Sequence, residues 1–230
     1  MRVLVTRPLE DAGPFAARLR ERGHEALIAP LLAVRFHDGP PLSLEGIDGI
    51  LATSANGVRA LARRTQRREV PLYAVGPQTA DAAWEAGFAK VESADGDVAA
   101  LAQALPRWVA TGAKLLHARG AEGGGRLASL LAAEGYGVRS AVLYDVVAST
   151  ALPDTVVDAL ASLDAAVFFS PRSARVFAEC TVEAGLRAAC ARLTALCISE
   201  ATASALAPLT FAACRIAERP NQDALLACLG

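Results

Sequence analysis

The sequence has little of what metal centres and nucleophilic active sites are built from. Its three histidines form neither an HExxH motif nor a group with cysteine. Its five cysteines lie in the C-terminal part, and no two form a CxxC pair. GxSxG, GxGxxG and Walker A motifs are also absent. We therefore expect no metal site, no catalytic serine elbow and no disulfide framework, and the cysteines should pack as reduced, small hydrophobic side chains.

Long apolar runs and a dominant charge are missing too. No stretch approaches the roughly 20 apolar residues that span a membrane. Charges interrupt the N-terminal run "MRVLVTRPLED" too early for a signal peptide. The net charge of −1 gives no electrostatic footprint for a polyanion. These observations predict a cytoplasmic protein with neither nucleic acid nor membrane as a partner.

What the sequence does have is the pattern of an α/β protein. It holds 230 residues, 53% of them hydrophobic, which is enough for one large domain or two small ones. Short aliphatic runs such as "RVLVT" and "GILAT" alternate with longer helical patterns such as "ANGVRALARR". This alternation predicts parallel sheets with helices on both faces. Glycines suited to a left-handed helix end follow four of the helical patterns, at Gly23, Gly87, Gly135 and Gly185.

Three units of the chain occur twice, in the same order. "VLVTRPLEDAGPFAARLRERGHE" aligns with "LLHARGAEGGGRLASLLAAEGYG", "DGILATSANGVRAL" with "DAAVFFSPRSARVF", and "VGPQTADAAWEAGF" with "ISEATASALAPLTF". The equivalent positions include Arg7 with Arg119, Ser54 with Ser170, and Thr79 with Thr202. Because three matches in one order are not expected by chance, the sequence predicts a duplicated α/β protein.

The repeat leaves two topologies open. The halves could be tandem domains that meet near residue 110. Alternatively, the first unit could join the last two, with the middle three as an inserted domain. The second topology needs two crossing segments, and 32–42 and 141–153 are extended runs that end near proline and could pair as a short ladder.

Polar turns follow several of the expected strands, where parallel α/β sheets place their ligands. Thr53-Ser54, Gly76 and Ser170 each precede an expected helix. A Ser or Thr there can simply cap the helix, or the free N–H groups of the first turn can bind an anion. The candidate substrate-binding residues in these turns are Thr53, Ser54, Ala55, Gly76, Thr79, Ser170, Arg172, Ser173 and Thr202.

Three further side chains could contribute chemistry. Arg7 and Arg119 follow their strands at equivalent repeat positions, where each could bind a carboxylate or form a local ion pair. Tyr144 lies in the second crossing segment. A tyrosine hydroxyl is protonated at neutral pH and can donate a proton or a hydrogen bond, but this ring could equally cover an apolar joint.

The order of the motifs resembles the uroporphyrinogen-III synthase family. The stretches are "VLVTRP", "LRERGHEALIAPLLAV", "ILATSANGV", "YAVGPQTADAAWEAGF", "LLHARG", "GYGVRSAVLYDV", "VFFSPRSARVF" and "CISEATASAL". Each motif is short, but together they span nearly the whole chain. The family is similar at the linker tyrosine and at the Ser/Thr positions of the turns, whereas Ser199 and Glu200 stand where it usually has Gly and a neutral residue.

This resemblance implies the discontinuous topology. It gives two similar three-layer α/β/α domains, flavodoxin-like and related by a swapped duplication. One domain would combine residues 1–33 with 149–230, and the other would be 41–140. Segments 34–40 and 141–148 would be linker strands, with the active site in the cleft between the domains.

The resemblance also implies a monomeric lyase that uses no cofactor and no metal. Its small-molecule substrate would be hydroxymethylbilane, a linear tetrapyrrole with eight carboxylates. The reaction closes it to uroporphyrinogen III with loss of water and inversion of the last pyrrole ring. Tyr144 would assist departure of the hydroxyl group. A non-catalytic two-lobed module that binds a polyanionic small molecule is the alternative expectation.

Overall fold

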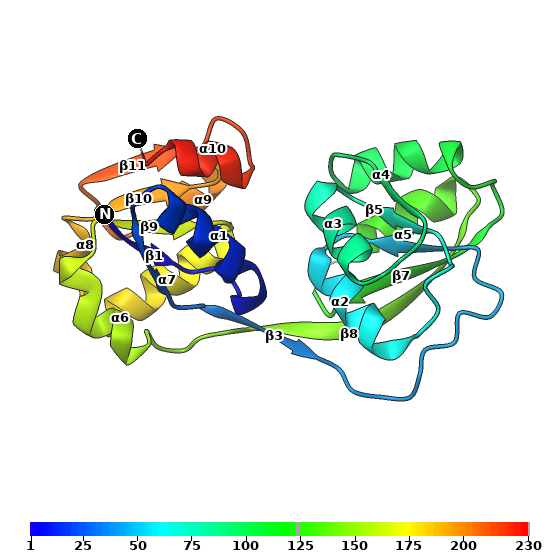
Figure 1. The fold of residues 1–230 in the computed structure, drawn as a ribbon, viewed down its shortest axis with the longest axis horizontal. Helices are drawn as coiled ribbons and strands as arrows, with labels where there is room; N and C mark the ends of the chain where they lie inside the picture. The colour runs from blue at the N-terminus through cyan, green and yellow to red at the C-terminus, as the bar shows by residue number, and fades with distance from the viewer. Residues whose placement is uncertain (123–124, 230) are drawn as a thin grey trace. The chain divides into compact units, whose positions relative to one another are not determined.

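The computed structural model describes residues 1–122 and 125–229. The chain divides into two units, of which unit 1 combines Met1–Ala33 with Val147–Gly230 and unit 2 is Val34–Val146. In Figure 1 each unit is a sheet with helices on both of its faces. The predicted α/β class with parallel sheets is confirmed.

Unit 1 is built on a five-stranded parallel sheet of order β11-β10-β9-β1-β2. Its strands are β1 (Arg2–Val5), β2 (Glu25–Ile28), β9 (Ala165–Phe168), β10 (Thr194–Cys197) and β11 (Ala213–Ile216). Its helices are α1 (Leu9–Glu21), α6 (Asp154–Ala159), α7 (Pro171–Glu183), α8 (Arg187–Cys190), α9 (Glu200–Ser204) and α10 (Gln222–Ala227), with a 3₁₀ turn at Leu160–Ser162.

Unit 2 is built on a six-stranded sheet of order β3-β8-β7-β4-β5-β6. Its strands are β3 (Leu32–Phe36), β4 (Gly49–Ala52), β5 (Leu72–Ala74), β6 (Val91–Ser93), β7 (Lys114–Gly120) and β8 (Gly137–Ala148). Its helices are α2 (Ala55–Arg64), α3 (Pro77–Glu85), α4 (Val98–Ala104) and α5 (Gly125–Ala133), with a 3₁₀ turn at Leu105–Arg107. β4 to β8 run parallel.

The duplication extends to the register of the strands. In unit 1, Val3 of β1 lies opposite Ala165 of β9. In unit 2, their repeat equivalents Leu115 and Gly49 lie opposite each other. The strand order of unit 2 without β3, β8-β7-β4-β5-β6, is the order β2-β1-β9-β10-β11 of unit 1 when each strand is replaced by its repeat partner. The predicted repeat is therefore a repeat of structure, with the chain entering the two copies at different strands.

Apolar side chains on both faces of each sheet form the cores. In unit 2, Val58 and Leu61 of α2 pack with Leu116 on one face, and Leu127 of α5 packs with Leu115 on the other. All five side chains are at most 1% exposed. Strands buried on both faces read as continuous apolar runs, which is why "RVLVT" and "GILAT" are recognisable as strands in the sequence. The four glycines expected to end helices have φ between +72° and +85°.

β3 and β8 lie side by side and connect the two units (Figure 1). The amide of His37 donates to Leu143 O at 2.8 Å, and the amide of Ser149 donates to Leu31 O at 2.9 Å. Partner numbers fall on one strand as they rise on the other, so the two strands are antiparallel. β8 is longer than the expected linker strand, because residues 137–142 and Tyr144 also pair with β7. Tyr144 therefore lies within the sheet of unit 2.

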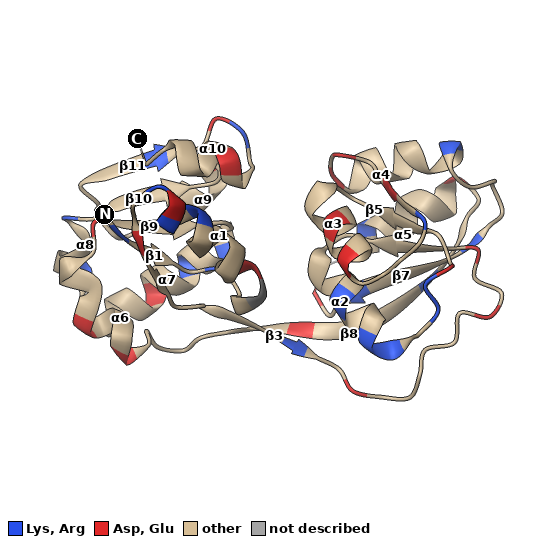
Figure 2. Ribbon diagram, viewed as in Figure 1, with Lys and Arg blue, Asp and Glu red and all other residues tan. Residues whose placement is uncertain are grey.

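Basic side chains gather on α2 and the segment after it, as Figure 2 shows. Arg64 donates to the carbonyls of His37 and Pro40, and Arg67 donates to that of Leu44. These arginines thus bind the segment after β3 to the rest of unit 2.

Among the described helices, none is long and apolar enough to cross a membrane.

Candidate functional site

The turn after β4 is held by the hydroxyl of Ser54. Ser54 is the N-cap of α2, with φ −160° and ψ 153°, and its Oγ accepts a hydrogen bond from the Gly57 amide at 3.0 Å. The cap leaves the first amides of the helix, those of Ala55 and Asn56, pointing past the end of the strand. The backbone of this turn can therefore receive an anion.

Tyr144 meets this turn. Its Oη lies 2.9 Å from Ser54 Oγ, and either hydroxyl can be the donor. The side chain is 8% exposed and packs in the core that α2 and α3 form on the sheet. Gly120, which lies opposite Tyr144 after an irregularity in the β7–β8 register, gives the ring its space. Two residues proposed from separate parts of the sequence are thus joined by a direct contact.

Thr53 points to the other face of the sheet, where its Oγ1 lies 3.3 Å from Nε2 of His117. His117 is fully buried in β7, and the Nδ1 atom has no hydrogen-bond partner within the described part of the chain. Burial, and secondly the positive charge of Arg119, lower the pKa of His117 from 6.5 to about 4. The imidazole is therefore neutral at physiological pH and is not a proton donor there.

The buried neutral His117 predicts acid sensitivity. In the unfolded chain histidine takes up a proton near pH 6.5, but in the folded protein only near pH 4, so stability is lost as the pH falls through this window. The loss amounts to about 3 kcal/mol by the bottom of it. His117→Val, which copies the equivalent Val5, should remove most of this dependence. Urea unfolding of both proteins at pH 7 and 4.5 measures it, and equal losses in both would contradict the prediction.

The turn after β5 carries a second candidate pair in unit 2. Gly76 is the N-cap of α3 without a side-chain cap, and Pro77 begins the helix. Thr79 is 5% exposed, and its amide donates to Gly76 O at 3.1 Å. At the end of β7, the guanidinium of Arg119 donates to Gly120 O at 2.9 Å, so this arginine supports its own strand end.

Unit 1 repeats these turns with different side chains. Ser170 caps α7, accepting from the Ser173 amide at 3.1 Å, and the two hydroxyls are also 3.1 Å apart. Arg172, partly exposed, is the second residue of that helix. Thr202 is fully buried, and its Oγ1 lies 3.0 Å from Oγ of Ser199. Both hydroxyl pairs lie within one helical turn, so capping accounts for their geometry.

Ser199 and Glu200 depart from the pattern of the resembling family, and the structure explains one of them. Ser199 is the N-cap of α9 with φ −161°, an extended conformation that needs no glycine, and its Oγ accepts from the Thr202 amide. Glu200 is exposed in the first turn. Its carboxylate disfavours a second anion at this helix end.

Arg7 takes part in a local cluster. The side chain is 8% exposed, its Nη2 lies 3.5 Å from Asp11 Oδ2, and its Cζ lies 4.2 Å from the ring centroid of Phe169. The local ion pair, one of the two roles considered for this residue, is present. Binding of a carboxylate by Arg7 stays a prediction.

Six of the predicted residues gather in two places. Thr53, Ser54 and Tyr144 lie together at the carboxyl edge of unit 2, and Ser170 lies with Arg172 and Ser173 in unit 1. His117 and Gly120 were not among the candidates. The signals for them were weak: a polar residue inside an apolar strand, and a glycine directly after the strand's arginine.

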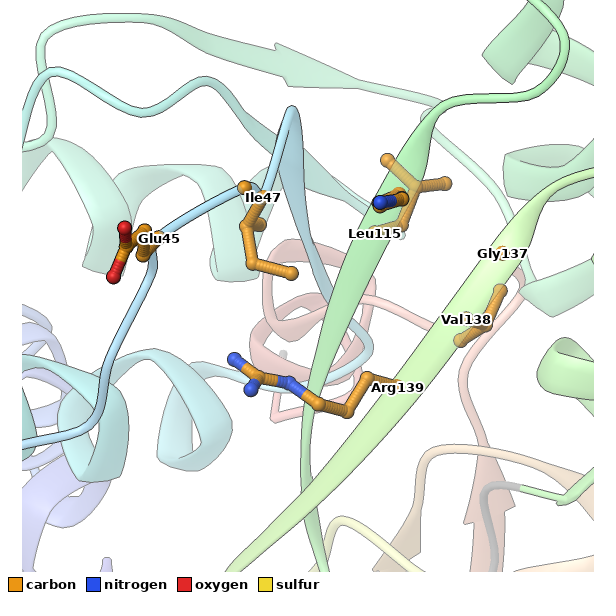
Figure 3. A pocket seen from close by; sticks show the side chains of 8 residues that line it. Glu45, Ile47, Leu115, Gly137, Val138 and Arg139 are labelled. Carbon is orange, nitrogen blue, oxygen red and sulfur yellow. The ribbon is translucent and has the colours of Figure 1, made fainter.

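A hollow of about 420 Å³ lies at the opposite edge of the same sheet, where β7 and β8 begin (Figure 3). Arg139 reaches across β7 there, and its Nη2 donates to the carbonyl of Ser43 at 2.6 Å. Charges of both signs line the hollow, from Glu45, Lys114 and Arg139. It lies away from the polar turns. In residues 1–122 and 125–229, no three His, Cys, Asp or Glu side chains form a group that could hold a metal ion.

Comparison with known proteins gives one consistent result. The family model described as "Uroporphyrinogen-III synthase HemD" matches residues 13–227. A protein of Helicobacter pylori 26695 solved under the name uroporphyrinogen-III synthetase is 19% identical, with a TM-score of 0.65 over all of this chain and 98% of its own. A mutant uroporphyrinogen III synthase of the extremely thermophilic bacterium Thermus thermophilus is 21% identical, with a TM-score of 0.52 over all of this chain and 97% of its own. These two likenesses show the fold.

A curated relative is similar over a shorter stretch. The Methanocaldococcus jannaschii protein named "Putative uroporphyrinogen-III synthase" is 38% identical over 61 residues. That stretch is 26% of this chain and 25% of the relative's length.

Proposed function

We propose that this chain, which belongs to the uroporphyrinogen-III synthase family, closes hydroxymethylbilane to uroporphyrinogen III with loss of water. The family match over residues 13–227 is the observation that carries this proposal. The enzymes of the family are lyases. The fold agrees with this assignment, because solved synthases share it.

We propose that the polar turns bind the carboxylates of the bilane. The amides of Ala55 and Asn56 in unit 2, and of Arg172 in unit 1, are first-turn donors whose helix dipoles favour an anion. The Arg172 side chain adds a positive charge beside one of these turns. The other candidates are secondary, because the described hydrogen bonds and ion pair of their side chains or backbone are to residues nearby in the sequence. They are Gly76, Thr79, Thr202, Arg7 and Arg119.

Tyr144 is the proton donor in this proposal. Its hydroxyl gives a proton to the hydroxymethyl oxygen and the C–O bond breaks. Water departs, and an azafulvene cation remains. The last pyrrole ring attacks this cation through its substituted α-carbon and forms a spiro intermediate. The bond from that carbon to the preceding methylene bridge then breaks, and the bridge bonds to the free α-carbon, so that the ring is inverted. The proton lost from this second α-carbon restores the phenol. Enclosure that keeps water from the cation and bends the chain for inversion supplies the rest of the rate.

The remaining features of the enzyme are proposed on the same basis. We expect a cytoplasmic monomer, with domains 1–33 plus 149–230 and 41–140 joined by linker strands 34–40 and 141–148. The antiparallel pairing of β3 and β8 supports the two linker strands.

Consumption of hydroxymethylbilane tests the proposed function. The substrate is generated enzymatically and its disappearance is followed with the purified chain and with the heat-denatured chain. We expect consumption well above the spontaneous rate, with no added cofactor. A binding module would leave the spontaneous rate unchanged or slow it, and that result would contradict the proposal.

A further inference from the structure

We propose that Ser54 and Gly120 are positioning residues that direct the O–H of Tyr144 towards the leaving hydroxyl group of the substrate. This inference rests on the proposed function and adds two residues to it. Ser54 acts through a hydrogen bond to the phenol oxygen. Gly120 acts by leaving the space in which the phenol lies.

The Ser54 hydroxyl can donate its single hydrogen to Tyr144. A serine hydroxyl has two lone pairs and one hydrogen. One lone pair accepts from the Gly57 amide at 3.0 Å, and Oγ also lies 2.9 Å from the Tyr144 hydroxyl oxygen. When Ser54 donates its hydrogen to Tyr144 Oη, the hydrogen of the phenol is left for a ligand.

This arrangement suits the proton transfer. As the phenol gives its proton to the hydroxymethyl oxygen, negative charge develops on Oη. With Ser54 as the donor, its hydrogen points at that atom, and a donor placed where charge develops stabilises the reacting state more than the ground state. The water that leaves carries the proton, and the proton released on ring closure returns to Oη.

Gly120 controls the position of the ring. A Cβ atom at this residue would lie 2.8 Å from Cζ, 2.9 Å from Cε2 and 3.2 Å from Oη of Tyr144. All three atoms are at the far end of the side chain, so an alanine would displace the hydroxyl and leave the backbone in place. Gly120 follows the point where the register of β7 and β8 shifts, opposite Tyr144. The irregular pairing of β7 and β8 therefore leaves space for the phenol ring of Tyr144.

The duplicated fold separates this role from helix capping. Ser170 occupies the equivalent position in unit 1, with φ −159° and ψ 152°, and it caps α7 in the same way. Its hydroxyl meets Ser173 within the same helical turn. Capping therefore requires no contact with a phenol, and the Ser54–Tyr144 pair is an addition made in unit 2.

Kinetics of Ser54→Gly and Gly120→Ala test the proposal. Glycine is tolerated at an N-cap, so Ser54→Gly removes the hydroxyl with little loss of the helix end. We expect kcat to fall about tenfold in Ser54→Gly and up to about a hundredfold in Gly120→Ala, with KM changed less than about twofold. In a Tyr144→Phe background, each should change kcat by less than about twofold. Asn221→Gly, which removes the N-cap side chain of α10, should leave kcat unchanged.

A spectroscopic measurement tests the positioning without activity. The chain has only three tyrosines, so tyrosine labelled with ¹³C at Cζ gives three signals, and Tyr144→Phe assigns one. We expect both variants to shift the Tyr144 signal and to leave those of Tyr73 and Tyr136 in place. An unchanged Tyr144 signal, or losses of kcat that persist in full in the Phe background, would overturn the positioning role. A wild-type protein that shows this contact but does not consume hydroxymethylbilane would instead overturn the proposed function.

Discussion

Tyr144→Phe should lower kcat for uroporphyrinogen III formation by about a hundredfold, the lower end of what a general acid contributes. The phenyl ring can keep its place, because Tyr144 is 8% exposed among apolar neighbours. Ser54 continues to cap α2 through the Gly57 amide. The loss should therefore appear in kcat, with stability reduced by only about 1 kcal/mol for the missing hydrogen bond. Initial rates over a range of hydroxymethylbilane concentrations measure it.

Tyr136→Phe is the matched control. Tyr136 is 4% exposed, and its hydroxyl donates to the carbonyl of Val109 at 3.2 Å in the same unit. This substitution also removes one phenol hydrogen bond from a buried ring, but it should leave kcat unchanged. Equal rates for Tyr144→Phe and the wild type would remove Tyr144 from the catalytic role.

Gly57→Ala should destabilise the protein by about 2 kcal/mol, as overpacking a rigid contact typically does. A Cβ atom at Gly57 would lie 2.7 Å from the carbonyl oxygen of Ala118 in β7 and 3.4 Å from Ser54 Oγ. Both α2 and β7 are parts of the backbone framework, so neither can yield cheaply. Moving α2 away would also lengthen the Ser54–Tyr144 contact, so kcat should fall together with stability. Denaturant unfolding and initial rates measure the two effects.

Gly13→Ala should change stability in the opposite direction. Gly13 lies inside α1, and a Cβ atom there would meet nothing within 4 Å. Alanine is the better helix former, so this substitution should stabilise the protein by about 0.5–1 kcal/mol. Stabilisation by Gly57→Ala as well would show that α2 does not pack against β7 as closely as described.

Local pattern and repetition made much of this fold predictable. The N-cap serines Ser54 and Ser170 and the helix-ending glycines follow from residues close in sequence. The alignment of the repeats also agrees with the observed register, since Val3 and Leu115 each pair at equivalent positions. β6 gives no apolar run in the sequence, because it is a three-residue edge strand whose central residue, Glu92, is exposed. The choice between tandem and swapped topology came from the family resemblance, because the same repeats align in either.

The contacts within the site were beyond the reach of pattern. Ser54 and Tyr144 are 90 residues apart, and Thr53 and His117 are 64 apart. Each contact depends on which strands are neighbours and on the irregularity before Gly120, and neither leaves a periodic signal in the sequence. Arg7 shows a different limit. Its local partner Asp11 can be identified from the sequence, but the sequence does not tell whether Arg7 pairs with Asp11 or binds a ligand.

The isomer composition of the product tests the central claim most directly. Hydroxymethylbilane is incubated briefly with the purified chain, the product is oxidised to the porphyrin, and the type I and type III isomers are separated. Spontaneous closure gives the uninverted type I isomer, so a no-enzyme control defines the background. We predict that type III predominates with the wild-type chain. Only type I product, in the amount found in the control, would contradict the assignment.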